Sequence, residues 1–313
     1  MLLIYQRPIH GLSVCKNLWE VEWAPAVSCY HALEDLRVNV SDALRNPGLF
    51  AKKALGKLRR RIVSIPDQAI QERMAGGVLF EHKRLSFIDE DDIRAMMTHS
   101  YDITLCDCLR KHLRPGDIML DVGANIGYIS AVAASGVGTA GEVHGFEPLI
   151  ECFERVENLS RLNSQFKFIF HNVALGAQKG SLSINFDPDG DMRNATLLPG
   201  KKTPATREVP VWRLDDYIFE NIASPERIKF IKIDVEGFEF SVLQGLERFL
   251  TKWQPLIVCE IKPWEIKALG YTMKDFDEFM KRFGYRTYDM LNEAKVINLA
   301  ALPDMETVLF RAQ

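Results

Sequence analysis

Five short apolar segments, separated by stretches with helical spacing, constrain the fold of this chain more than any other feature. The segments span residues 118–122, 142–146, 166–170, 230–233 and 256–260. Each has the length of a strand, and apolar runs of this kind are typical of strands buried on both faces of a parallel sheet. The sequence therefore predicts an α/β fold with a mainly parallel sheet and helices on both faces.

Two further regions surround this alternation. Residues Gly180–Phe186 and Arg207–Trp212 alternate polar and apolar side chains, which predicts an antiparallel insertion with a surface loop at 187–206. Near the start, Gly76–Phe80 and Leu85–Ile88 predict two short strands around a polar turn. We therefore divide the chain into a small N-terminal extension at 1–75, partly helical, and a main domain at 76–313.

Composition excludes several classes of protein. The 313 residues carry a formal net charge of -3, so no global field attracts nucleic acid or an anionic membrane. A basic run at 52–61 predicts either a solvated helix face or a contact with phosphate. Residues 1–4 are too short an apolar stretch for a secretory signal, and no segment reaches the roughly 20 apolar residues that cross a bilayer.

The six cysteines are scattered, which favours a reduced, cytoplasmic setting. Cys106 and Cys108 form the only close pair, and on a helix they would point to different faces. We interpret both as ordinary thiols, and the sequence assigns no residue as a metal ligand.

The first apolar segment ends in the stretch Asp121–Gly127, which holds two glycines. In open α/β sheets ligands bind beyond the carboxyl ends of the strands, and glycines let the backbone turn tightly there. Asn125 occupies the place of the second glycine in a dinucleotide fingerprint, which disfavours a pyrophosphate ligand. The Asp121 carboxylate suits a ligand with a positive charge or donor groups, such as a methionine ammonium.

The second segment ends in Glu147, one strand-helix-strand unit after the first motif. A carboxylate at this place can accept hydrogen bonds from both hydroxyls of a ribose. The alternative is an acid that stabilises the N-terminus of the following helix. Taken in order, the two acids and the glycines between them predict a nucleoside site.

These motifs resemble the FkbM family of methyltransferases. The resemblance rests on Ile118–Tyr128, Gly145–Pro148, Ile231–Glu239 and Val242–Gly245, and it covers roughly residues 76–313. It implies a Rossmann-like class I methyltransferase fold with S-adenosylmethionine as methyl donor. It also implies O-methylation of a hydroxyl on a small-molecule or glycan acceptor, such as a sugar, a polyketide or another natural product.

The resemblance assigns roles to particular residues. The predicted cofactor-binding residues are Asp121, Gly123, Asn125 and Gly127 around the methionyl and ribose parts, Glu147 on the ribose hydroxyls, and Asn172 and Ala174 beside the adenine. No acidic residue follows the third strand to accept from the adenine amine, so backbone groups would serve there.

The predicted catalytic residues are Asp234 and Glu236, where the fourth strand leaves the sheet. One carboxylate, such as Asp234, can act as general base if burial raises its pKa, or two can hold a divalent cation that acidifies the acceptor hydroxyl. Strand-end capping is the structural alternative. Glu260 and Lys262 either complete the pocket or form an ion pair at its rim.

Two other functions stay open at this point. A nicotinamide dinucleotide oxidoreductase shares the first unit but favours glycine at Asn125. A non-catalytic nucleoside-binding or scaffold protein would keep the same fold without turnover. A nucleic-acid methyltransferase is disfavoured, because the chain lacks a strongly basic surface.

Overall fold

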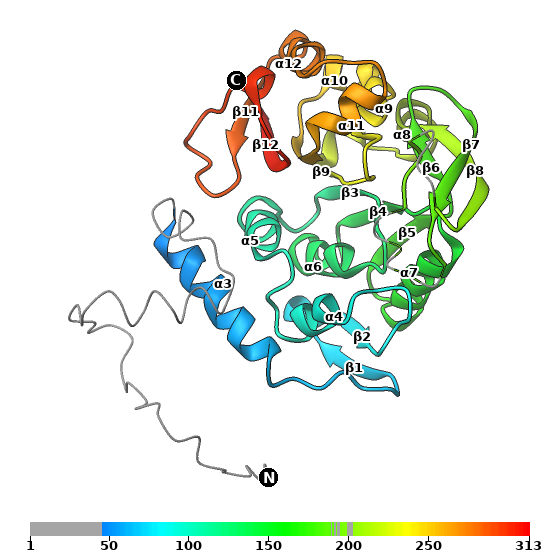
Figure 1. The fold of residues 1–313 in the computed structure, drawn as a ribbon, viewed down its shortest axis with the longest axis vertical. Helices are drawn as coiled ribbons and strands as arrows, with labels where there is room; N and C mark the ends of the chain where they lie inside the picture. The colour runs from blue at the N-terminus through cyan, green and yellow to red at the C-terminus, as the bar shows by residue number, and fades with distance from the viewer. Residues whose placement is uncertain (1–45, 189, 191, 193–194, 199–202) are drawn as a thin grey trace. The chain divides into compact units, whose positions relative to one another are not determined.

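A seven-stranded sheet forms the centre of the protein in the computed structural model, which describes residues 46–313 except 189, 191, 193–194 and 199–202. The strand order is β11-β12-β10-β9-β3-β4-β5 (Figure 1). The strands are β3 (Ile118–Val122), β4 (Glu142–Phe146), β5 (Lys167–His171), β9 (Ile228–Ile233), β10 (Leu256–Ile261), β11 (Tyr285–Asp289) and β12 (Glu306–Ala312).

All five predicted strands are present within one or two residues of their expected bounds. Neighbours among β3, β4, β5, β9 and β10 pair in parallel, whereas β12 is antiparallel to both β10 and β11. The sheet is thus mainly parallel, which confirms the predicted Rossmann-like α/β fold. The antiparallel edge was not predicted from the sequence.

Helices cover both faces of this sheet. Alternate residues of each strand point to opposite faces, and the two large hydrophobic clusters divide accordingly, with Met119 and Phe230 in one and Leu120 and Ile231 in the other. The first face carries α4 (Glu90–Met97), α5 (Ile103–His112), α6 (Tyr128–Val137) and α7 (Ile150–Leu162). The second carries α8 (Leu214–Asn221), α9 (Glu239–Gln244), α10 (Glu247–Lys252), α11 (Pro263–Ala268) and α12 (Met273–Arg282), followed by the turn η4 (Leu299–Ala301).

The segment before the sheet differs from the prediction. Strand β2 (Leu79–His82) pairs with β1 (Ile70–Arg73), and the turn η1 (Ala75–Gly77) connects them. Leu85–Ile88 forms a turn instead of the predicted strand, with Leu85 and Ile88 both buried at a spacing of three residues. The hairpin crosses the predicted boundary at residue 75. Helix α3 (Pro47–Arg60) carries the basic run and packs against α4 and α5.

The predicted insertion is a separate three-stranded sheet of order β6-β8-β7. Its strands are β6 (Ala174–Gly176), β7 (Gly180–Phe186) and β8 (Ala205–Arg213), and the short turn η3 (Pro225–Arg227) leads from α8 into β9. Strands β7 and β8 are antiparallel, as predicted, and β6 adds a parallel strand. The first part of the connecting loop carries Thr196, whose backbone pairs with Asn185 of β7.

The strand order reverses at β3, which pairs with β4 on one side and β9 on the other. The connection after β3 leads to β4 on one side, whereas the connection after β9 leads to β10 on the other, and this arrangement opens a crevice beyond the carboxyl ends of β3 and β9. Within the described residues, no helix has the length and apolar character needed to cross a membrane.

Candidate active site

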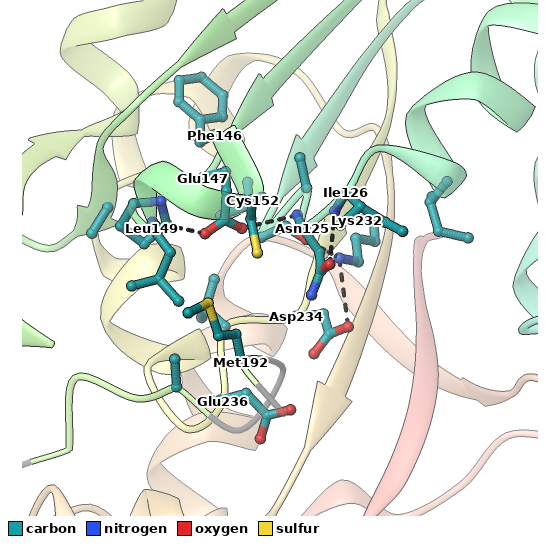
Figure 2. Close-up of a pocket in the computed structure, with 18 of the residues that line it drawn as sticks. Asn125, Ile126, Phe146, Glu147, Leu149, Cys152, Met192, Lys232, Asp234 and Glu236 are labelled. Atoms are coloured by element: carbon teal, nitrogen blue, oxygen red, sulfur yellow. Dashed lines mark hydrogen bonds and ion pairs between the residues drawn. The ribbon is translucent and has the colours of Figure 1, made fainter. Parts of the chain in front are cut away.

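A cavity of about 420 Å³ lies beyond the carboxyl ends of β3, β4 and β9. Figure 2 shows that side chains from all three strand ends converge on it, with Met192 of the insertion between Leu149 and Glu236. Its volume lies in the range of cofactor and small-molecule sites. Of the predicted residues, the cavity wall includes Gly123, Asn125, Glu147, Ala174, Asp234 and Glu236.

The loop after β3 requires its first glycine for a close approach. Gly123 has φ +80°, and a Cβ there would lie 1.9 Å from the carbonyl oxygen of Asp234. The glycine thus lets two strand ends meet, a reason that the motif alone did not reveal. Asn125 also has a left-handed backbone, with φ +51°, and its Oδ1 accepts a hydrogen bond of 2.7 Å from the amide of Ile126.

Glu147 closes the other side of this loop. Its Oε2 accepts from the Asn125 amide and its Oε1 from the Leu149 amide, each at 2.9 Å (Figure 2). Each carboxylate oxygen keeps a second lone pair for a further donor. Burial raises the pKa of Glu147 to about 7, although both amides and the nearby Lys232 act in the opposite direction. Glu147 therefore both shapes the loop and presents acceptor capacity to the cavity.

Asp121 does not line the cavity. Its carboxylate is fully buried, accepts 2.6 Å from Ser130 Oγ, and has an Oδ1 without a hydrogen bond 3.4 Å from the Lys232 ammonium. Burial raises the pKa of Asp121, while Lys232 and Ser130 lower it. In this structure Asp121 supports the cavity wall from behind, and its predicted direct contact with a methionine ammonium stays a prediction.

Gly127 and Asn172 also lie outside the cavity wall. Gly127 has φ +85° at the start of α6, where a Cβ would lie 3.0 Å from Val156 and Leu159 of α7. Because glycine has no side chain, the two helices can pack closely here. The Asn172 amide donates to the carbonyls of Glu147 and Pro148 at 2.9 and 3.0 Å. Both residues hold the elements that carry the wall.

Lys232 is a functional residue that the sequence reasoning missed. It faces Asp121 across the β3–β9 register, is 6% exposed, and donates 2.6 Å to the Gly123 carbonyl. Its ammonium also lies 3.5 Å from Asp234 (Figure 2). Despite burial, the charges of Asp234 and Asp121 raise the pKa of Lys232, so it stays charged. A lysine inside the apolar run Phe230–Ile233 is the signal that could have found it.

Three carboxylates converge where β9 and β10 end. Oxygen atoms of Asp234, Glu236 and Glu260 lie within 4.8 Å of one another, so the two predicted catalytic acids share one site. Lys262 bonds Glu236 and lies 3.0 Å from Glu260, which is the predicted ion pair. Glu260 also lines the cavity, whereas Lys262 does not. Burial raises the pKa of Glu236 to about 7, opposed by Lys262 and assisted by Asp234.

This acidic group tests the idea of a divalent cation. Three carboxylates are a suitable oxygen donor set for Mg²⁺. However, the Lys262 ammonium already bonds two of the three and supplies the positive charge that a cation would bring. The arrangement favours acid–base chemistry by these carboxylates over metal chemistry.

The opposite wall comes from the α4–α5 segment, whose part in the site was not predicted. Met96, Tyr101 and Asp102 line the cavity there. Asp102 caps α5 by accepting from the Leu105 amide at 3.2 Å and has a left-handed backbone, with φ +33°. An aspartate that precedes a helical pattern signals a cap in the sequence, but nothing local indicates that this cap faces a pocket.

Apolar side chains complete the end of the cavity near Glu147. Phe146, Leu149 and Val173 lie beside Ala174, the first residue of β6. A slot of this kind accepts a flat apolar surface, such as the faces of a heterocyclic base.

Comparison with known proteins identifies the class that this fold and cavity define. A family model described as the methyltransferase FkbM domain matches residues 121–287, more than half of the chain. The protein is a methyltransferase. It belongs to the FkbM methyltransferase family, as the sequence motifs predicted, and this membership replaces the alternative of a nicotinamide dinucleotide oxidoreductase.

Two similar proteins are also named as methyltransferases. Methyltransferase sdnD of Sordaria araneosa is 26% identical over 222 residues, which cover 60% of this chain and 82% of the relative. Methyltransferase 1 of Beauveria bassiana is 26% identical over 147 residues, which cover 41% of this chain and 58% of the relative. The second alignment thus spans little more than half of that protein.

Solved structures show more distant similarity. A methyltransferase FkbM from Methylobacillus flagellatus matches with a TM-score of 0.41 and 16% identity, over 71% of this chain and 54% of that chain. A SAM-dependent O-methyltransferase from Thermotoga maritima matches with a TM-score of 0.38 and 11% identity, over 79% and 78% of the two chains.

Proposed function

We propose that this methyltransferase uses S-adenosylmethionine to methylate a hydroxyl of a small molecule, most suitably a sugar, a glycan or another polyhydroxylated natural product. One observation carries the proposal. The cavity joins a nucleoside-type end, built around Glu147, to an acidic end that contains Asp234 and Glu236. A donor and an acceptor can therefore meet in one enclosed space.

The residues at the first end fit the proposed cofactor. Glu147 retains lone pairs for ribose hydroxyls, and Phe146, Leu149 and Val173 form an apolar slot for a base. Bound S-adenosylmethionine supplies an electrophilic methyl carbon on a sulfonium leaving group. The chain's own task is to orient the acceptor oxygen toward that carbon and to remove its proton.

Glu236 is the carboxylate best suited to take the proton. A general base works best when its pKa lies near the working pH, and the pKa of Glu236 is raised to about 7. Asp234 is 42% exposed at its side chain, and its charge contributes to that raised pKa. We therefore assign the acceptor proton to the Glu236 carboxylate, with Asp234 as acceptor-positioning neighbour and Lys262 holding the base.

The charge of the cavity favours particular acceptors. Among the described residues, its wall carries the five carboxylates Asp102, Glu147, Asp234, Glu236 and Glu260, and Lys232 is its one cation. Such a surface attracts hydroxyl donors and ammonium groups and repels carboxylates and phosphates. A nucleic acid is disfavoured for the same reason. The cytoplasmic setting predicted from the cysteines stays part of this proposal.

Calorimetric titration with S-adenosylmethionine, followed by a turnover assay on a panel of sugars, hydroxylated natural products and carboxylic acids, tests the proposal. We expect binding to weaken at least about tenfold in Glu147→Gln, because one charged hydrogen-bond acceptor is lost. Glu236→Gln should bind the cofactor normally but lose turnover. The exposed control Glu226→Gln should behave as wild type.

Three results would overturn this assignment. Absence of S-adenosylmethionine binding would refute the donor. Binding without turnover on any acceptor would favour the non-catalytic alternative, and methylation of carboxylic acids in preference to hydroxyls would refute the acceptor class.

A further inference from the structure

Three potential metal ligands of different chemistry lie near the C-terminal end of α5, away from the active-site cavity. Cys108 and His112 lie four residues apart and thus on one face of the helix. Glu293 reaches them from the segment that connects β11 and β12. The thiol, an imidazole nitrogen and a carboxylate oxygen all lie within 4.8 Å of one another. His112 Nε2 is 2.8 Å from Glu293 Oε2.

This donor set has the character of a zinc site. Zn²⁺ takes sulfur, nitrogen and oxygen ligands at about 2.0–2.3 Å, which separates ligand atoms by about 3.5 Å in a tetrahedron. The imidazole and carboxylate atoms, 2.8 Å apart, would have to separate slightly to reach that size, and the thiol lies within 4.8 Å of both. Mg²⁺ and Ca²⁺ prefer oxygen alone, so the thiol and imidazole select a softer ion. Three protein ligands leave the fourth position to water.

The surroundings hold the ligands in place and give access. Cys108 is 3% exposed, and the Glu293 backbone is tied to β12 by a hydrogen bond of 3.2 Å from Arg311. A second cavity, of about 570 Å³, is lined by Cys108 and Glu293 and lies between α3, α5 and residues 290–294. It shares no lining residue with the active-site cavity, and it offers an entry path for an ion.

One cation competes for this place. Lys111 Nζ lies 2.7 Å from the same Glu293 oxygen that faces His112. Its side chain is 59% exposed, so it can move into solvent when an ion arrives. The competing explanation is therefore a simple ion pair of Lys111, His112 and Glu293, in which Cys108 only fills space.

We propose that Cys108, His112 and Glu293 form a zinc-binding site that joins the end of α5 to the β11–β12 connection. The ion would replace the Lys111 contact and displace the thiol proton. Because α5 is capped by the cavity residue Asp102, such a link would fix a helix whose other end lines the active-site cavity. This site is independent of the proposed methyl transfer.

Zinc titration of the purified full-length protein, freed of metal by a chelator, tests the proposal. We expect one Zn²⁺ per chain to depend on this site, and Co²⁺ at the same site to show thiolate-to-cobalt charge-transfer absorption. Cys108→Ser and His112→Ala should each lose at least about tenfold in affinity and the zinc-induced rise in Tm. Cys106→Ser is the matched control, because Cys106 is equally buried on the same helix and its thiol bonds the Tyr101 carbonyl.

Lys111→Met separates the two explanations. If zinc binds here, removal of the competing ammonium should tighten zinc binding. If the group is only an ion pair, the variant should lower Tm without any effect of zinc. Glu293→Gln serves as a second ligand variant if Cys108→Ser does not fold. Absence of zinc binding would refute the site. Zinc affinity that is unchanged in both Cys108→Ser and Glu293→Gln would refute it as well.

Discussion

The buried ammonium of Lys232 gives the sharpest test of how the site is held together. Lys232→Met keeps the apolar stem of the side chain but removes its charge, its 2.6 Å bond to the Gly123 carbonyl and its contact with Asp121. Asp121 is fully buried and would be left as an uncompensated charge. Removal of one partner of a buried ion pair costs about 3–5 kcal/mol, which is the loss we expect in the free energy of unfolding at pH 7.5.

The sign of the pH dependence follows from Asp121. Without Lys232, burial raises the folded-state pKa of Asp121 further above its unfolded value. The folded variant then takes up a proton at low pH, so its deficit relative to wild type shrinks as pH falls and is full above the raised pKa. Unfolding curves in urea at several pH values measure this directly.

Two companion variants make the test specific. Asp121→Asn in the Lys232→Met background removes the stranded charge, so the double variant should lose at least about 1.5 kcal/mol less than the sum of the single variants. Lys229→Met, at an exposed position of the same strand, should stay within about 0.5 kcal/mol of wild type. Additive losses in the double variant, or a loss below about 1 kcal/mol in Lys232→Met, would refute the reasoning.

Three further outcomes are expected. Below pH 7, kcat/KM should fall about tenfold per pH unit as Glu236, with its pKa of about 7, is protonated, and a flat rate profile would exclude it as the base. In urea unfolding, the free energy of unfolding of Gly123→Ala should be about 1–3 kcal/mol lower than that of Gly138→Ala. Both glycines have positive φ, but only Gly123 lacks room for a Cβ. Asn172→Ala should weaken S-adenosylmethionine binding about tenfold at unchanged kcat in a steady-state assay, since Glu147 loses its backbone support, and unchanged affinity would contradict this role.

The parallel part of the sheet could be predicted because β3, β9 and β10 contain runs of buried apolar residues, and helical patterns separate the five strands. Strand β12 has the same apolar centre at 308–310, but no α-helix separates it from β11, so it falls outside the strand-helix alternation that marks the parallel strands. Leu85–Ile88 misled the prediction in the opposite sense. Its two buried residues are three apart, a spacing that suits a turn as well as a strand.

The candidate site was predictable only where its residues follow strand ends. Glu147 directly follows β4 and Asp234 directly follows β9, and both line the cavity. Asp121 comes one residue before its strand ends, and its carboxylate lies on the sheet face that α6 covers, beside Ser130 and Lys232. Asp102 and Met192 reach the cavity from elements far away in sequence, and only tertiary packing brings them there.

Thr196 attaches the loop between β7 and β8 to the end of β9. Its hydroxyl donates to the Glu236 carbonyl, and its side chain is 1% exposed, whereas its neighbours Ala195 and Leu197 line the cavity. Attachment and cavity lining thus fall on alternate residues of one three-residue stretch. The flanking side chains can therefore change the shape of the cavity while the same hydroxyl keeps the loop attached to the end of β9.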